Sequence, residues 1–179
     1  MTAVSTSTTF ASDGDISTLH KVFDLIAKRA QIMQSIAADK YVKKSSIYAS
    51  ERELEVLKHV KDVVHQQGLP VYPMLVFTQI QMDMSKFIEQ YWLNVWIKTP
   101  DYFQQHNLDL ELLRNEITKI DDQLYPAIKE SLSSFKRCSM TTSITLFSKA
   151  MENVKGIPTD PDYTSLMLAS LVAVSQVQQ

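Results

Sequence analysis

The sequence has few of the residues that build metal sites and disulfides. Its 179 residues include one cysteine, Cys138, and four histidines, none of which stands in an HExxH or CxxC setting. A lone cysteine cannot form a disulfide within the chain, and a zinc site needs several such ligands. We therefore expect neither an intrachain disulfide nor a metal ion. We interpret Cys138 as a packed or exposed spectator, with an intermolecular bridge or a catalytic thiol as the alternatives.

The sequence also lacks the signals that predict strands, membrane spans or strongly charged surfaces. The chain has only three glycines, and no segment shows a convincing alternation of apolar and polar residues. Apolar residues recur at helical spacing, and no run approaches the roughly 18 apolar residues of a transmembrane helix. The net charge of −2 and the pI near 6.1 argue against a nucleic-acid surface or a polybasic membrane patch. The sequence therefore predicts an all-α domain that binds neither nucleic acid nor a membrane.

The chain divides into a short polar start and one helical domain. The first residues, "MTAVSTSTTFASDGD", are small and polar, without the cationic start and apolar stretch of a signal peptide. We expect residues 1–16 to form a flexible tail and residues 17–179 to form one domain. The chain is then either cytoplasmic or a mature exported protein written without its leader.

About six helices are expected, two or three of them long. Ser50 and Glu53 have the spacing of a capping box, Gly68 is a good C-terminal stop, and Pro126 should kink or end its helix. The last helix could start at Asp160 as its N-cap or at Asp162. The predicted helices span about 17–42, 50–68, 72–98, 108–126, 140–154 and 163–177.

Two cations occupy core positions of the first predicted helix. In "RAQIMQSIAADKY", Arg29 and Lys40 share a face with Met33 and Ile36, because eleven residues make almost three helical turns. The steps between these positions alternate between four and three, which is typical of a long bundle seam. Both cations are therefore expected to point into the bundle.

Arg52 and Arg114 also lie on apolar helix faces in the second and fourth predicted helices. Each of the four cations could snorkel, with its methylenes on apolar surface and its charged head in water. Burying all four without partners would cost several kcal/mol each, and Glu53 and Glu89 are the few inward carboxylates. The excess of cations favours an anionic ligand with more than one carboxylate.

The spacing of these residues resembles that of a known family. Arg29, Lys40, Arg52 and Glu53 fit the pattern R-x10-K-x11-R-E of the all-helical, AroQ-type chorismate mutases. The phrase "RAQIMQSIAADK" is similar to the family's R-x-x-x-M-x-x-V-A-x-x-K. The resemblance implies a long-helix bundle of the AroQ type.

Other segments resemble the exported, or gamma, subclass of that family. In "QIQMDMSKFIEQY", Gln81, Ser85 and Glu89 fit its Q-x-x-x-S/T-x-x-x-E/Q pattern. Arg114 in "LDLELLRNEI" matches the arginine that a second helical segment of the same chain supplies. The segment "DYTSLMLASL", from Asp162, resembles the subclass's C-terminal helix. The resemblance extends over roughly residues 19–175 and implies a homodimer whose active site lies within one chain. It also favours export to the periplasm or medium over the cytoplasm.

The resemblance implies an isomerase that converts chorismate into prephenate in the shikimate pathway of aromatic amino acid biosynthesis. This unimolecular pericyclic reaction needs no cofactor, metal or nucleophile, but requires a flexible dianion to be held in its reactive conformer. By resemblance, the carboxylate-binding residues are Arg29, Arg52, Arg114 and Ser85. Lys40 and Glu89 would face the ether oxygen, and Glu53 would accept from the substrate hydroxyl. Glu89 must be protonated to donate a hydrogen bond there, because an ionised carboxylate only accepts.

Two residues leave the function open. Ala49 stands where the family often has an aspartate, three residues before Arg52. Glu53 is claimed both by the capping box and by the substrate, and it cannot serve both. The alternatives are a helical protein of the same fold that binds a dicarboxylate or a protein partner without turnover, and a bundle whose four cations merely snorkel.

Overall fold

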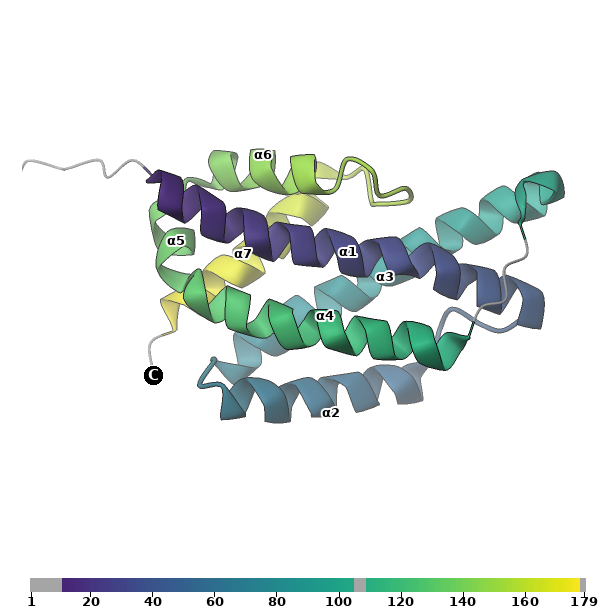
Figure 1. Cartoon of the computed structure of the whole chain (residues 1–179), viewed down its shortest axis with the longest axis horizontal. Helices are drawn as coiled ribbons and strands as arrows, with labels where there is room; N and C mark the ends of the chain where they lie inside the picture. Colours follow the sequence, from purple (N-terminus) through teal and green to yellow (C-terminus); the bar gives the residue numbers. More distant parts are fainter. Residues whose placement is uncertain (1–10, 105–108, 178–179) are drawn as a thin grey trace, which may run out of the picture.

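The computed structural model describes residues 11–104 and 109–177, and within them helices are the only regular secondary structure. This confirms the expected all-α class, with more helices than predicted (Figure 1). The elements are α1 (Asp13–Lys43), α2 (Ser50–Gln66), α3 (Val71–Lys98), the 3-10 helix η1 (Pro100–Tyr102), α4 (Leu110–Glu130), α5 (Leu132–Arg137), α6 (Met140–Ala150) and α7 (Pro161–Gln176). None of these helices combines the length and the apolar character needed to cross a membrane.

The helix α1 begins earlier than the sequence suggested. A capping box starts it: the Ser12 hydroxyl accepts from the Asp15 amide at 3.2 Å, and the Asp15 carboxylate accepts from the Ser12 amide at 3.0 Å. These two bonds satisfy donors that a helix start leaves without partners. The predicted helix start at Ser17 and the predicted tail over residues 1–16 are therefore corrected: residues from Asp13 onward are helical. The rest of the predicted tail, residues 1–10, lies outside the described part of the chain.

Other helix ends also differ from the prediction. Ser50 is itself helical and Ala49 is the N-cap of α2, so the predicted capping box of Ser50 and Glu53 does not form. Pro126 does not end α4, which continues to Glu130. The helix tolerates the lost amide bond because the residues around Pro126 are buried against the core. Asp160 caps α7, which confirms the first of the two expected starts.

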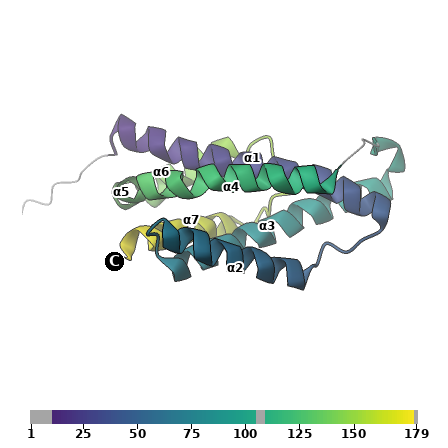
Figure 2. The ribbon, with the colours of Figure 1, turned by 60° about the horizontal axis from the view of Figure 1, so that its bottom comes forward.

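The long helices form two sides of a bundle. Helices α1 and α4 lie side by side on one side, and α2, α3 and α7 lie on the other (Figure 2). Helix α1 also packs against α3, so the seam positions predicted from its sequence lie at the centre of the bundle. Toward its N-terminal half, the Phe23 ring meets the rings of Phe135 and Phe147 edge-on, with centroids 6.2 and 5.6 Å apart. This apolar packing holds α1 in place, and with it the cations further along the helix.

A smaller aromatic cluster fixes the other end of α1. Tyr41 packs against Trp96 and Phe103, with ring centroids 5.6 and 4.8 Å apart. The Trp96 ring also stacks on Trp92 one turn earlier in α3. This cluster joins the end of α1 to α3 and to the residue that follows η1. It therefore fixes how α1 and α3 face each other at Lys40, the residue directly before Tyr41.

Candidate active site

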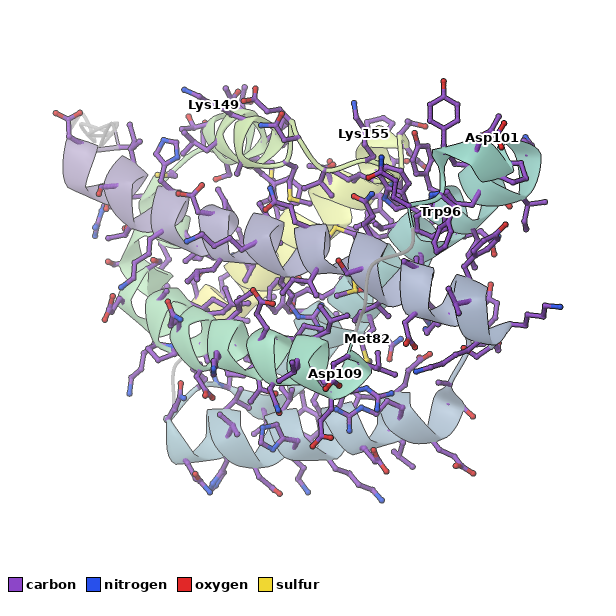
Figure 3. All side chains as sticks on the ribbon, turned by 45° about the vertical axis from the view of Figure 1, so that its right-hand side comes forward. Met82, Trp96, Asp101, Asp109, Lys149 and Lys155 are labelled. Carbon is purple, nitrogen blue, oxygen red and sulfur yellow. The ribbon has the colours of Figure 1, made fainter. Side chains whose placement is uncertain are left out.

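A cavity of about 130 Å³ lies among α1, α2, α3 and α4. Its wall also includes Ile47 and Ala49 from the segment between α1 and α2. Met82 is part of the wall, and in Figure 3 it lies on α3 with Trp96 further along the same helix. Six of the seven residues predicted as site residues line this cavity: Arg29, Lys40, Arg52, Glu53, Ser85 and Glu89.

Arg29 joins three helices at one wall of the cavity. Its side chain is 9% exposed, Nη1 donates to Ser85 Oγ of α3 at 3.3 Å, and Nε pairs with Asp121 Oδ1 of α4 at 3.2 Å. The Ser85 hydroxyl in turn donates to the carbonyl of Gln81 at 2.9 Å. The guanidinium is thus oriented by one carboxylate and one hydroxyl. Its remaining N–H groups are available for an anion.

Asp121 is a residue that the sequence reasoning missed. Burial raises the pKa of its carboxyl, while the charge of Arg29 works against that rise. A buried ion pair is costly to break, so Asp121 stabilises the inward orientation of Arg29. The signal in the sequence is its place one helical turn after Ile117, on the face of α4 that reaches the cavity.

Lys40 and Glu89 form the most enclosed ion pair of the cavity. Lys40 Nζ on α1 lies 2.6 Å from Glu89 Oε2 on α3, and the side chains are 16% and 6% exposed. Burial raises the pKa of Glu89, while the charges of Lys40 and Lys86 hold it down and that of Glu53 adds to the rise. The carboxyl is therefore closer to protonation near neutral pH than an exposed glutamate.

The α2 residues form the opposite, more open wall. Arg52 is 50% exposed, and its Nη1 pairs with Glu55 Oε2 of its own helix at 3.0 Å. Glu53 turns the other way and its Oε2 pairs with Lys86 Nζ of α3 at 3.0 Å. The inward orientation of Glu53 is the one expected for a substrate contact, whereas its use in a capping box is wrong.

Lys86 is the second residue that the sequence reasoning missed. It follows Ser85 and lies one turn before Glu89, so its position on α3 shares an edge with the predicted polar row. That spacing could have indicated it, but a single lysine beside a polar row is also typical of a solvated helix edge. Its contact with Glu53 depends on how α2 packs on α3, which the sequence does not specify.

Arg114 is not brought to the cavity wall. It is exposed on the second turn of α4, whereas Ile117 of the next turn lines the cavity. The two residues lie on the same side of α4, because a three-residue step nearly completes one helical turn. Arg114 therefore stands near the mouth of the cavity, outside its wall in this structure.

The chemistry of the cavity is that of an anion site. It combines two arginines and two lysines with two carboxylates and one hydroxyl. Over residues 11–104 and 109–177, no group of three or more His, Cys, Asp and Glu residues is arranged to hold a metal ion. Fold and cavity together define an all-helical protein with an open cavity in which cationic side chains outnumber carboxylates.

Comparisons with known proteins agree on one family. Residues 20–90 match the family described as chorismate mutase type II. A monofunctional chorismate mutase from Enterobacter agglomerans is 29% identical over 126 residues, which cover 70% of this chain and 69% of that protein. The chain is therefore similar to the type II chorismate mutases over residues 20–90 and to a chorismate mutase over most of its length.

Solved structures share this fold over most of the chain. The secreted chorismate mutase from Yersinia pestis has a TM-score of 0.73 and 17% identity, over 84% of this chain and 94% of that one. A chorismate mutase from Burkholderia phymatum has a TM-score of 0.70 and 15% identity, over 92% and 99% of the two chains. At these identities the likeness establishes the fold, and it confirms the predicted AroQ-type bundle.

Proposed function

We propose that this protein is a chorismate mutase, which isomerises chorismate to prephenate. The observation that carries the proposal is one open cavity whose wall combines the Lys40–Glu89 pair with Arg29 and the α2 residues Arg52 and Glu53. The reaction is unimolecular and pericyclic. The protein therefore has to hold the substrate in its compact conformer and stabilise the charge that develops on the breaking ether bond.

Arg29, Arg52 and Ser85 bind the two substrate carboxylates. Arg29 is already oriented by Asp121 and Ser85, so little conformational entropy is lost when it binds an anion. Arg52 lies at the open rim with an exposed partner, Glu55, which it can exchange for the substrate at small cost. Arg114 is the third arginine that we assign to the carboxylates; it is exposed on α4, three residues before the cavity-lining Ile117.

Lys40 and Glu89 act at the ether oxygen. The Lys40 ammonium stabilises the negative charge that grows there as the C–O bond breaks. Glu89 donates a hydrogen bond to the same oxygen only when it is protonated. Burial favours that protonated state, and a dianion bound beside Glu89 favours it further. Glu53, held toward the cavity, accepts from the substrate hydroxyl.

The test is to mix purified protein with chorismate and follow the loss of its ultraviolet absorption together with prephenate formation. Turnover well above the uncatalysed rate supports the proposal. No turnover over a broad pH range refutes it. In that case, protection of Lys40 from chemical modification by chorismate supports the alternative of a dicarboxylate-binding protein, which the exposed Arg114 and the apolar Ala49 favour.

We also propose that the protein works as a homodimer outside the cytoplasm, with each active site within one chain. Six proposed site residues line one cavity of a single chain, which supports a self-contained site. The shared fold with a chorismate mutase that is secreted supports export. Light scattering during gel filtration tests the dimer, and fractionation of cells expressing the full gene tests export.

A further inference from the structure

Lys86 is the cation of the cavity to which the family resemblance assigns no role. It lines the wall from α3, and its side chain is 19% exposed. Its Nζ lies 3.0 Å from Glu53 Oε2 of α2 and 3.0 Å from Asp83 Oδ1 of its own helix. It also lies 5.8 Å from the centroid of the Tyr48 ring. Its contact with Glu53 links α2 to α3 across the wall of the cavity.

The surroundings of Lys86 keep it charged. Burial lowers the pKa of its ammonium, but the carboxylates of Asp83 and Glu53 outweigh that effect and raise the pKa above its ordinary value. Truncating a lysine that is largely shielded from water and paired with a carboxylate of another helix costs more stability than truncating a surface lysine. Lys86 is therefore a charged, largely buried part of the cavity wall and not a solvated surface side chain.

The start of α2 explains why Glu53 needs a partner. Ala49 is the N-cap of α2 and provides no side-chain hydrogen bond there. Ala49 also lines the cavity with an apolar methyl group, so it cannot orient a polar neighbour. Without a partner on α3, Glu53 would be free to turn toward the exposed backbone amides of the first turn of α2. The Lys86 ammonium holds the Glu53 carboxylate on the cavity side instead.

We propose that Lys86 is a positioning residue for the reaction: it holds Glu53 over the cavity, where Glu53 accepts the hydrogen bond of the substrate hydroxyl. This inference rests on the proposed function. It assigns to Lys86 the orienting role that Ala49 cannot fill. It also predicts that the kinetic effect of losing Lys86 depends on the presence of Glu53.

A second consequence concerns Glu89, which faces Lys40 of α1, Lys86 of α3 and Glu53 of α2. Both lysines lower the pKa of Glu89 through their charge, and Glu53 raises it. Removal of the Lys86 charge therefore raises the pKa of Glu89. The high-pH fall in activity, which reports that carboxyl, should then move to higher pH.

The experiment is a double-mutant cycle with Lys86→Met and Glu53→Gln, measured as kcat/KM for chorismate at several pH values. We expect Lys86→Met alone to lower kcat/KM about tenfold, and to change it less than about twofold in the Glu53→Gln background. Lys86→Arg should restore most activity, because it keeps the charge near Glu53. Lys58→Met, which removes an exposed charge from α2, is the control and should change neither the rate nor the pH profile.

The possible results separate this inference from the proposed function. No turnover by the unmodified protein refutes both. Turnover combined with equal effects of Lys86→Met in the two backgrounds refutes the positioning role alone. An unshifted pH profile in Lys86→Met, with circular dichroism and the unfolding midpoint preserved, refutes the second consequence, that the Lys86 charge lowers the pKa of Glu89.

Discussion

The replacement Glu89→Gln tests the chemistry assigned to the cavity. Glu89 can donate to the ether oxygen only when it is protonated, whereas a glutamine amide donates at every pH. Above the apparent pKa of Glu89, kcat/KM of the unmodified protein should therefore fall about tenfold for each further pH unit. The Gln variant should show a flat profile over the same range.

The structure also predicts how the pH–rate profiles of the parent and the Glu89→Gln variant differ. Burial raises the pKa of Glu89, so the protonated form persists to higher pH than for an exposed glutamate. At low pH the two proteins should have rates within about one order of magnitude, since each presents a donor to the same position. At high pH the Gln variant should become the faster enzyme. The two curves should cross on the falling limb of the parent.

The assay is the initial rate of chorismate loss from about pH 5 to about pH 9 at constant ionic strength. Glu53→Gln provides the matched control, because it removes another carboxylate from the same cavity while leaving Glu89 able to titrate. The control should keep the falling limb. Identical pH profiles for Glu89→Gln and the parent would refute the donor role of Glu89.

Two further predictions concern activity and stability. Arg29→Ala and Arg52→Ala should both remove most activity. In urea denaturation, Arg29→Ala should lower the free energy of unfolding by about 3 kcal/mol, because it leaves Asp121 buried and unpaired. Arg52→Ala should lower it by less than about 1 kcal/mol, because its ion pair is exposed, and equal losses in the two variants would contradict this prediction. Gly156→Ala should lower the unfolding midpoint, since φ is +85° and an added Cβ would lie 2.6 Å from Tyr91 Cβ; an unchanged midpoint would contradict it.

Most of the fold could be predicted because its signals are local. The apolar spacing in α1 and α3 predicts both long helices, and the Asp160 cap predicts the start of α7. The end of α4 could not be predicted in the same way. Pro126 is tolerated because tertiary packing of the following turn compensates for one missing amide bond, and no local pattern reports that packing.

In the candidate site, too, helical periodicity predicts some residues, whereas others depend on packing between helices. Arg29, Lys40, Ser85 and Glu89 project inward from α1 and α3, and helical periodicity places such residues on one face. Glu53 was ambiguous, because its choice between the start of α2 and the cavity depends on a lysine from another helix. Partners across helices depend on packing angles, which sequence spacing within one helix does not contain.

Asp121 and Arg114 illustrate the limits of reasoning from charge alone. Asp121 was overlooked because an aspartate near the middle of an amphipathic helix looks solvated, yet it pairs with the buried Arg29. Arg114 has the expected place in the chain, but its side chain is exposed beside the cavity mouth. Its place near the site followed from the sequence, whereas its side-chain orientation did not.

The central claim is that the charge of Lys40, fixed between α1 and α3, promotes the rearrangement of chorismate. The most direct measurement compares chorismate turnover by the parent, Lys40→Ala and Lys43→Ala. Lys43 is a matched control on the same helix, with a largely exposed side chain that pairs with Asp39. We predict that Lys40→Ala loses most turnover while Lys43→Ala keeps the parent's rate and all three remain folded. Turnover by Lys40→Ala at the parent's rate would contradict the account.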